Sequence, residues 1–212
     1  MASADAKERI IVAAERMIAE HGSEVPLRDI ALAAGQRNNS AVQYHFGTRD
    51  GLIDAVAEYR IADLEQRRLE LLAEAEETGE PGDVRALVSA LVVPMLTIPY
   101  ERGATHYARF LEQVRTHPAL AADTNLDRAG RAAVRLIIMR LDRALRDLSP
   151  ELRHRRLRSL PTVLFALLAD RERTVYAGDL PPDDPHSAAE LVDLIIGMLT
   201  APVSTAAASS LP

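Results

Sequence analysis

Apolar residues recur along most of the chain at the spacing that one face of an α-helix requires. The first segment shows this at positions i, i+4, i+7 and i+8, with Ile10, Ala14, Met17 and Ile18. No segment alternates apolar and polar residues as a half-buried strand does. We therefore expect an all-α protein of about nine helices, over residues 5–20, 26–34, 39–46, 49–77, 83–97, 104–116, 125–148, 150–176 and 187–200.

Capping and turn residues mark several helix ends. Asn38, Thr48 and Ser187 stand where an N-terminal cap is expected, and Gly22 and Gly35 follow helices as left-handed stops. These residues predict where five of the helices begin or end.

Two features predict the shape of the longer helices. No Gly or Pro follows Gly51 before residue 77, so residues 49–77 should form one uninterrupted helix. Pro94 and Pro161 lie inside predicted helices, which they should bend or divide.

The composition narrows the class of protein. The chain has 212 residues, no Cys and no Trp, and Ala and Leu dominate its apolar share of 48%. Absence of Cys excludes disulfides, iron–sulfur clusters and Cys-based zinc sites. No apolar run approaches the about 18–20 residues of a membrane span, and the polar, acid-containing start is unlike a signal peptide. We expect a cytoplasmic protein that does not enter the membrane.

Charge is distributed unevenly along the chain. The net charge of −6 argues against indiscriminate coating of nucleic acid. Residues 35–49 nevertheless contain no acidic side chain, in a chain that has 31. A small local DNA-binding face is compatible with this distribution, because DNA binding depends on the charge of the docking surface and not on the net charge of the chain.

The segments 26–34 and 39–46 have the pattern of a helix-turn-helix motif. Ala31 is small enough to let two helices approach, Gly35 supplies the turn, and Ile30, Val42 and Phe46 supply a shared core. In this motif the second helix lies in the major groove, with its first residues against base edges.

The second helix and its flanks are rich in hydrogen-bonding side chains. Asn and Gln can pair with adenine and Arg with guanine, and Thr48 and Arg49 suit phosphate oxygens. Arg49 in a first helical turn also opposes the helix dipole, so something besides helix stability favours it there. The alternative is a solvated polar face on an ordinary helical hairpin. The candidate DNA-binding residues are Arg37, Asn38, Asn39, Ser40, Gln43, Tyr44, His45, Thr48 and Arg49.

The run Tyr44-His45-Phe46-Gly47-Thr48-Arg49-Asp50-Gly51-Leu52 resembles the signature of TetR-type transcriptional regulators. The resemblance covers about residues 8–56, with Arg49 at the customary Lys. The sequence departs from the family twice. The turn after Gly35 is one residue longer, and Gln43 replaces the usual phosphate-contacting Tyr, where a glutamine can read a base instead.

The resemblance implies a homodimeric repressor that a small-molecule effector releases from a near-palindromic DNA operator. It implies a helix-turn-helix domain over residues 1–48 and a ligand-binding and dimerisation domain over 49–204; the Ala/Ser-rich residues 205–212 should be a disordered tail. No cofactor or metal is expected. The candidate pocket residues are Tyr59, Met95, Tyr100, His106, Tyr107, Phe110, Gln113, Met139 and Phe165.

The last two predicted helices are candidates for a dimer interface. The segment 187–200 is apolar nearly all round, so it needs partners on more than one side. The alternative is that these residues fill the core of the single chain. The candidate interface residues are Leu157, Leu160, Leu164, Leu168, Leu191, Leu194, Ile195 and Met198.

Other functional readings have weaker support. The six His residues show no metal-ligand spacing, and Asp184, His186 and Ser187 resemble a catalytic triad only by composition. The Arg-rich segment 154–158 fits a solvated helix face better than a second nucleic-acid patch. We expect no enzymatic activity. The second functional hypothesis is a helical binding or interaction protein whose N-terminal hairpin does not bind DNA.

Overall fold

The computed structural model describes residues 2–36, 38, 40–79, 81–97, 105–120 and 128–203, and all regular structure within these ranges is helical. The predicted all-α fold is confirmed. None of the described helices combines the length and apolar character that a membrane crossing requires. The helices are α1 (Ala2–His21), α2 (Leu27–Ala33), α3 (Ala41–Phe46), α4 (Arg49–Tyr59), α5 (Ile61–Glu77), α6 (Val84–Leu96), α7 (Tyr107–Val114), the 3-10 helix η1 (Pro118–Leu120), α9 (Ala132–Ala144), α10 (Pro150–Ala177) and α11 (Pro185–Thr200).

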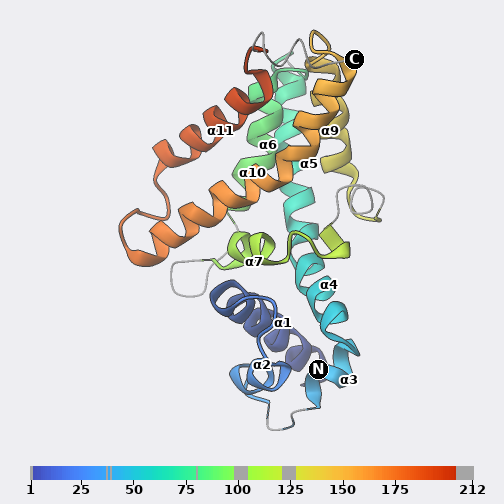
Figure 1. Cartoon of the computed structure of the whole chain (residues 1–212), viewed down its shortest axis with the longest axis vertical. Helices are drawn as coiled ribbons and strands as arrows, with labels where there is room; N and C mark the ends of the chain where they lie inside the picture. Colours follow the sequence, from blue (N-terminus) through green and yellow to red (C-terminus); the bar gives the residue numbers. More distant parts are fainter. Residues whose placement is uncertain are drawn as a thin grey trace.

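The helices form two groups, one at each end of the molecule, and α4 and α5 connect them (Figure 1). α1, α2 and α3 lie together at one end, and α4 followed by α5 runs from them along the long axis. At the other end α6 and α9 pack against α5, and α10 and α11 pack against α6 and against each other. α7 lies between the two ends and packs against both α1 and α10.

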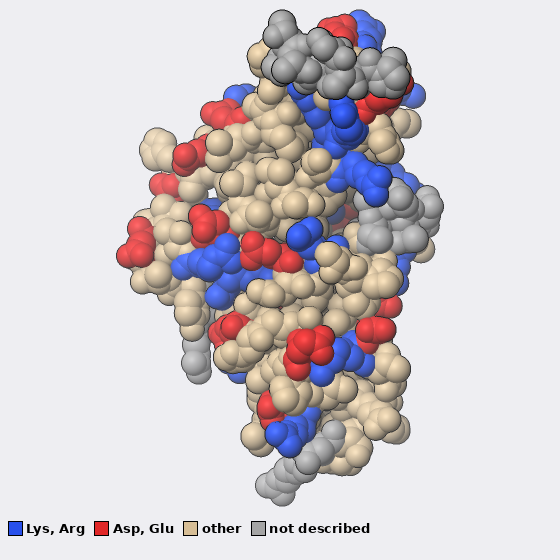
Figure 2. All heavy atoms as spheres, viewed as in Figure 1, with Lys and Arg blue, Asp and Glu red and all other residues tan. Residues whose placement is uncertain are grey.

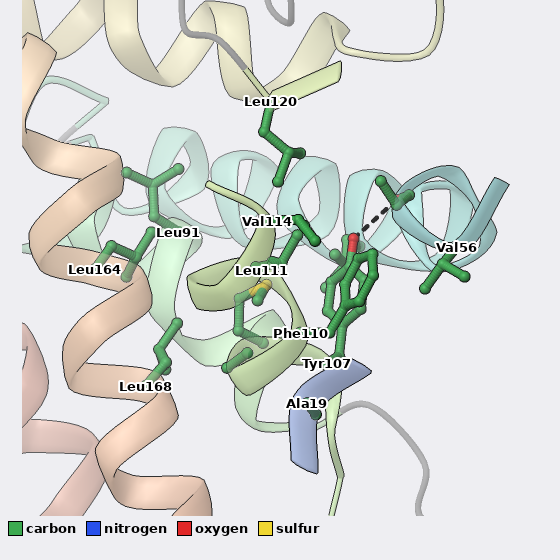
Figure 3. Close-up of a cluster of buried hydrophobic side chains, with 14 of the residues drawn as sticks. Ala19, Val56, Leu91, Tyr107, Phe110, Leu111, Val114, Leu120, Leu164 and Leu168 are labelled. Atoms are coloured by element: carbon green, nitrogen blue, oxygen red, sulfur yellow. Dashed lines mark hydrogen bonds between the residues drawn. The ribbon is translucent and has the colours of Figure 1, made fainter. Parts of the chain in front are cut away.

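The short helix α7 is the centre of the core between the two ends. Phe110 is fully buried, and its ring stacks on Tyr107 with the centroids 6.2 Å apart. Figure 3 shows these side chains between Leu164 and Leu168 of α10 and Val56 of α4. The hydroxyl of Tyr107 donates a hydrogen bond to the carbonyl of Ala57 at 2.8 Å, so this buried phenol is satisfied.

The predicted continuous helix over residues 49–77 is wrong, because a break at Arg60 separates α4 from α5. Arg60 has φ −92° and ψ −9°, away from helical values near −63° and about −42°. Its guanidinium donates to the Glu15 carboxylate of α1 at 3.1 and 3.4 Å. A contact with a residue 45 positions away therefore accompanies a break that no Gly or Pro marks.

Two helices begin later than their sequence pattern predicts. Residues 105 and 106 precede α7, and Arg131 precedes α9. In each case a distant carboxylate accepts hydrogen bonds from the first-turn amides: Glu172 at α7 and Glu65 at α9. Such caps leave no mark in the local sequence. The predicted starts at 104 and 125 lie outside the described residues.

Of the predicted helix caps at Thr48 and Ser187, the structure confirms the first and not the second. The Thr48 hydroxyl accepts from the amide of Gly51 at 3.0 Å, which confirms it as the cap of α4. Asp184 rather than Ser187 caps α11, because its carboxylate accepts from the Ser187 amide at 2.6 Å. Neither internal proline divides its helix: α6 continues past Pro94 and α10 past Pro161. The predicted tail over residues 205–212 lies outside the described residues, and the domain boundary near Thr48 stays a prediction.

Candidate nucleic-acid interface

α2 and α3 pack on each other through a small apolar core. Ile30 and Ala31 of α2 and Val42 of α3 are buried, and Phe46 packs against the same cluster. Ala31 carries only a methyl group at the contact, which allows the two helices to approach closely. The residues that predicted the helix-turn-helix core therefore do pack together.

The turn between the two helices begins at Gly35, which has φ +70°. Only glycine adopts this region at little cost, and the predicted left-handed stop is confirmed. The side-chain oxygen of Asn38 accepts from the Ser40 amide at 2.9 Å. Asn38 is thus a turn residue and not the predicted helix cap, because α3 begins only at Ala41.

The outward face of α3 is exposed and polar. Gln43 and Tyr44 point to solvent, and the Tyr44 side chain is 83% exposed. His45 is half-buried, with its ring 5.0 Å from that of Tyr44 in an edge-on arrangement. Asn38, Ser40 and Thr48 are exposed nearby, whereas Arg37 and Asn39 lie outside the described residues.

The junction of α3 and α4 depends on two glycines. Gly47 has φ +72°, a value that a side chain would strain. A Cβ atom at Gly51 would lie 2.2 Å from the carbonyl oxygen of Phe46. The end of α3 therefore approaches the first turn of α4 too closely for any other residue. In the sequence, Gly51 stands within the family signature and is the last glycine before residue 77, and neither observation pointed to this steric role.

Arg49 has partners within the chain. Its Nη1 donates to the carbonyls of Ser23 and Val25 at 2.6 and 2.7 Å, in the loop between α1 and α2. These bonds explain a cation in the first turn of α4, where it opposes the helix dipole. The prediction that something besides helix stability favours Arg49 there is therefore confirmed. Its role in DNA binding stays a prediction.

The face of this end that Figure 2 shows is not strongly charged. Figure 2 shows mostly uncharged residues at the lower end of the molecule, with a few basic and acidic side chains close together. Arg28 lies 3.4 Å from Asp29, and Lys7 lies 5.9 Å from the Phe46 ring centroid. Specific polar contacts and helix amides would have to supply more of any DNA affinity here than a broad basic patch.

α1 connects this end to the rest of the chain. Ile10, Ala14 and Ile18 are fully buried, as their helical spacing predicts. The hydroxyl of Tyr59 donates to the Glu8 carboxylate, close to the contact between Arg60 and Glu15. The hydrogen bond to Glu8 and burial raise the pKa of Tyr59. α1 is thus fastened to the α4–α5 junction by polar contacts in addition to its apolar stripe.

The candidate pocket residues do not line one buried site. Met95, Tyr107 and Phe110 belong to the core, and Tyr59, His106 and Phe165 are half-buried. Gln113 and Met139 are exposed on α7 and α9. Tyr100 lies outside the described residues.

The candidate dimer residues divide in a similar way. Leu194 is 50% exposed, and Leu157 and Met198 are partly buried. The others are buried within the single chain, so for them the alternative of a monomer core is correct: Leu160, Leu164, Leu168, Leu191 and Ile195.

The residues that resembled a triad have structural contacts. Asp184 caps α11, and the Ser187 hydroxyl accepts from Arg171 Nε at 2.9 Å. In the Arg-rich segment, Arg156 donates to the carbonyls of Leu199 and Ala201 at the end of α11. Within the described ranges, no group of three or more His, Asp or Glu side chains is placed to hold a metal ion.

The helix-turn-helix geometry at α2 and α3 is thus the feature of this chain that most resembles a binding site. Neither a comparison with protein-family models nor a search of curated proteins found a match for this sequence.

Proposed function

We propose that the chain is a sequence-specific DNA-binding transcriptional regulator of the TetR type. One observation carries the proposal: α3 packs on α2 through Ile30, Ala31 and Val42 and presents an exposed polar face to solvent. The acid-free stretch over residues 35–49 includes that face. A helix supported in this way can enter a major groove, where Gln43 reads a base edge and Tyr44 contacts the backbone.

The regulator acts as a homodimer on a near-palindromic operator, because two identical recognition helices read two identical half-sites. The exposed Leu194 and the partly buried Met198 on α11 support a contact with a second copy. A small-molecule effector that binds among α4–α10 releases the dimer from DNA by changing the placement of α4. α4 supports this step, because the candidate DNA-binding residue Thr48 caps its N-terminus and its last residue precedes the break at Arg60.

Selection of DNA sequences by the purified protein tests the proposal. We expect enrichment of an inverted repeat, with binding that weakens as salt concentration rises because phosphate contacts release counterions. Recovery of a single asymmetric half-site bound by one chain would contradict it, as would the absence of any enriched sequence.

The dimer has its own test in sedimentation equilibrium. Leu194→Glu places a charge on the proposed contact and should shift the protein towards monomer. Leu69→Glu is the matched control, since Leu69 is an exposed leucine on α5 at 45% exposure. Equal effects of the two substitutions would contradict this interface.

A further inference from the structure

Glu172 of α10 holds the beginning of α7. Its carboxylate accepts hydrogen bonds from the backbone amides of Ala108 and Arg109, both at 3.0 Å, and from the hydroxyl of Thr105. Glu172 is only 8% exposed. A buried side chain from one helix thus caps another helix 63 and 64 residues away in sequence.

Among the described residues, the cation that pairs with this carboxylate is Arg109, which is poorly placed to neutralise it. Arg109 Nε lies 3.8 Å from Glu172 Oε2, and both Nε and Nη2 of Arg109 are buried without a hydrogen-bond partner. The guanidinium instead faces the ring of Tyr176 at 5.0 Å. Arg173, the next residue of α10, pairs with Glu112 at 2.8 Å. Among the described residues, no cation is hydrogen-bonded to the Glu172 carboxylate.

Helix α1 adds charges of both signs from the other side of α7. Glu15 makes ionisation of Glu172 less favourable, although Arg60 pairs with Glu15 at 3.1 Å. Glu20 lies 3.4 Å from His106 Nε2. Burial, together with the charges of Arg109 and Arg16, lowers the pKa of His106 despite Glu20, so His106 supplies little positive charge at neutral pH.

Glu65 of α5 provides a comparison within the same chain. It caps α9 in the same manner, accepting from the amides of Ala133 and Val134 at 2.7 and 3.3 Å. It also accepts a hydrogen bond from the buried guanidinium of Arg68 at 3.1 Å. Among the described residues, only the α9 cap includes a hydrogen-bonded cation, whereas the α7 cap includes the Thr105 hydroxyl instead.

We propose that Glu172 is a proton-controlled cap, which holds the start of α7 firmly when its carboxyl group is protonated and loosens it when the proton leaves. The neutral group removes a buried charge; it can donate to the Thr105 hydroxyl and still accept from the helix amides. α7 packs against α1, so the loosening reaches the N-terminal helices. The inference goes beyond the proposed function and holds whether or not α3 binds DNA.

The pKa of Glu172 agrees with this geometry. Burial raises it to about 7, against the hydrogen bonds from the two amides and the charge of Arg109. A carboxyl group with a raised pKa in the folded state stabilises that state most at low pH. This contribution is lost as pH rises from the ordinary value of 4.5 towards 7. Opening of the start of α7 should therefore become on the order of tenfold more frequent between about pH 6 and pH 8.

Amide hydrogen exchange tests the inference on the unmodified protein. After correction for intrinsic rates, protection of the Ala108 and Arg109 amides should fall on the order of tenfold between these two pH values. The amides of Ala133 and Val134, which Glu65 caps, should keep their protection and serve as the internal control. An equal change at both pairs of amides, or no change at Ala108 and Arg109, would overturn the proposal.

A substitution identifies the group responsible. Glu172→Gln removes the ionisable group at nearly constant shape and should abolish the pH dependence at α7, whereas Glu112→Gln on the same helix should retain it. A pH dependence that survives Glu172→Gln would overturn the assignment. If the Glu172→Gln variant does not fold, a carbon-13 NMR titration of the Glu172 carboxyl group in the wild-type chain tests the proposal instead. A midpoint near 7 supports the proposal, and a midpoint near the ordinary 4.5 overturns it.

Discussion

Two regions of the molecule differ in the interactions that stabilise each of them. The unit of α2, α3 and the start of α4 relies on small and apolar residues and on the absence of side chains, at Ala31, Val42, Gly47 and Gly51. In the second region, which we call the seam, α1 packs against the α4–α5 junction and α7 packs against α1 and α10. The seam contains buried charged side chains, among them Glu15 and Glu172. Steric fit therefore positions α3, whereas ionic contacts position α1 against the α4–α5 junction and α7 against α10.

The difference predicts how each region responds to its surroundings. Apolar and steric contacts depend little on pH or on a single partner, so the unit of α2 and α3 should move as one body. A buried ion pair strongly destabilises the fold when one member is removed, because the other charge stays buried. The seam is therefore the region where single substitutions or protons have the largest effect.

The largest expected effect is that of Arg60→Leu. It removes the guanidinium that pairs with Glu15, whose side chain is only 5% exposed, and should cost about 3–5 kcal/mol of unfolding free energy in urea denaturation. The control is Arg67→Leu, which breaks exposed pairs with Glu70 and Glu74 and should change stability little. The double variant Glu15→Leu/Arg60→Leu should recover most of the loss. Equal losses of stability in Arg60→Leu and Arg67→Leu would contradict the claim that ion pairs in the seam matter more than ion pairs on the surface.

The next effect tests the steric side of the comparison. Gly51→Ala places a Cβ atom 2.2 Å from the Phe46 carbonyl oxygen and should cost about 2–3 kcal/mol, with loss of DNA binding as α3 shifts. Gly197→Ala is the control, because nothing lies within 4 Å of its Cβ position in α11. That substitution should stabilise the protein by about 0.5–1 kcal/mol. Similar thermal unfolding of the two variants would show that α3 is not held by this close approach.

The sequence predicted features that depend on local pattern far better than those that depend on distant contacts. The period of Ile10, Ala14 and Ile18, the turn at Gly35 and the cap at Thr48 are local patterns, and the structure bears them out. The break at Arg60 and the late starts of α7 and α9 coincide with contacts to residues 45 to 69 positions away. No local rule encodes such pairs, because a buried glutamate on a helix resembles a solvated one in sequence.

The candidate site shows the same division. The exposed face of α3 followed from the pattern of polar residues, but the intrachain partners of Arg49 did not, because they lie in a loop more than 20 residues earlier. The dimer residues were chosen for being apolar, which does not separate Leu164 in the core from the exposed Leu194. Apolar character predicts burial without saying whether the partner is the same chain.

Gln43→Ala tests whether the sterically fixed helix reads bases. If Gln43 makes a bidentate contact, the variant should lose about 1–3 kcal/mol of preference at one base pair and keep its affinity for random DNA. Gln66→Ala, an exposed glutamine on α5, is the matched control for fluorescence anisotropy titrations. Equal losses on selected and random DNA would contradict base reading by Gln43.

Tyr44→Phe should give the smallest effect and separates the two kinds of DNA contact on one helix. The substitution removes only the hydroxyl of an 83% exposed side chain, so packing within the chain should not change. Loss of one hydrogen bond to a phosphate should weaken binding by about 1 kcal/mol on selected and random DNA alike. The slope of affinity against salt concentration should stay the same, because a neutral hydroxyl releases no counterion. A change confined to the selected sequence would instead make Tyr44 a base-reading residue, and two adjacent side chains of α3, Gln43 and Tyr44, would then specify sequence.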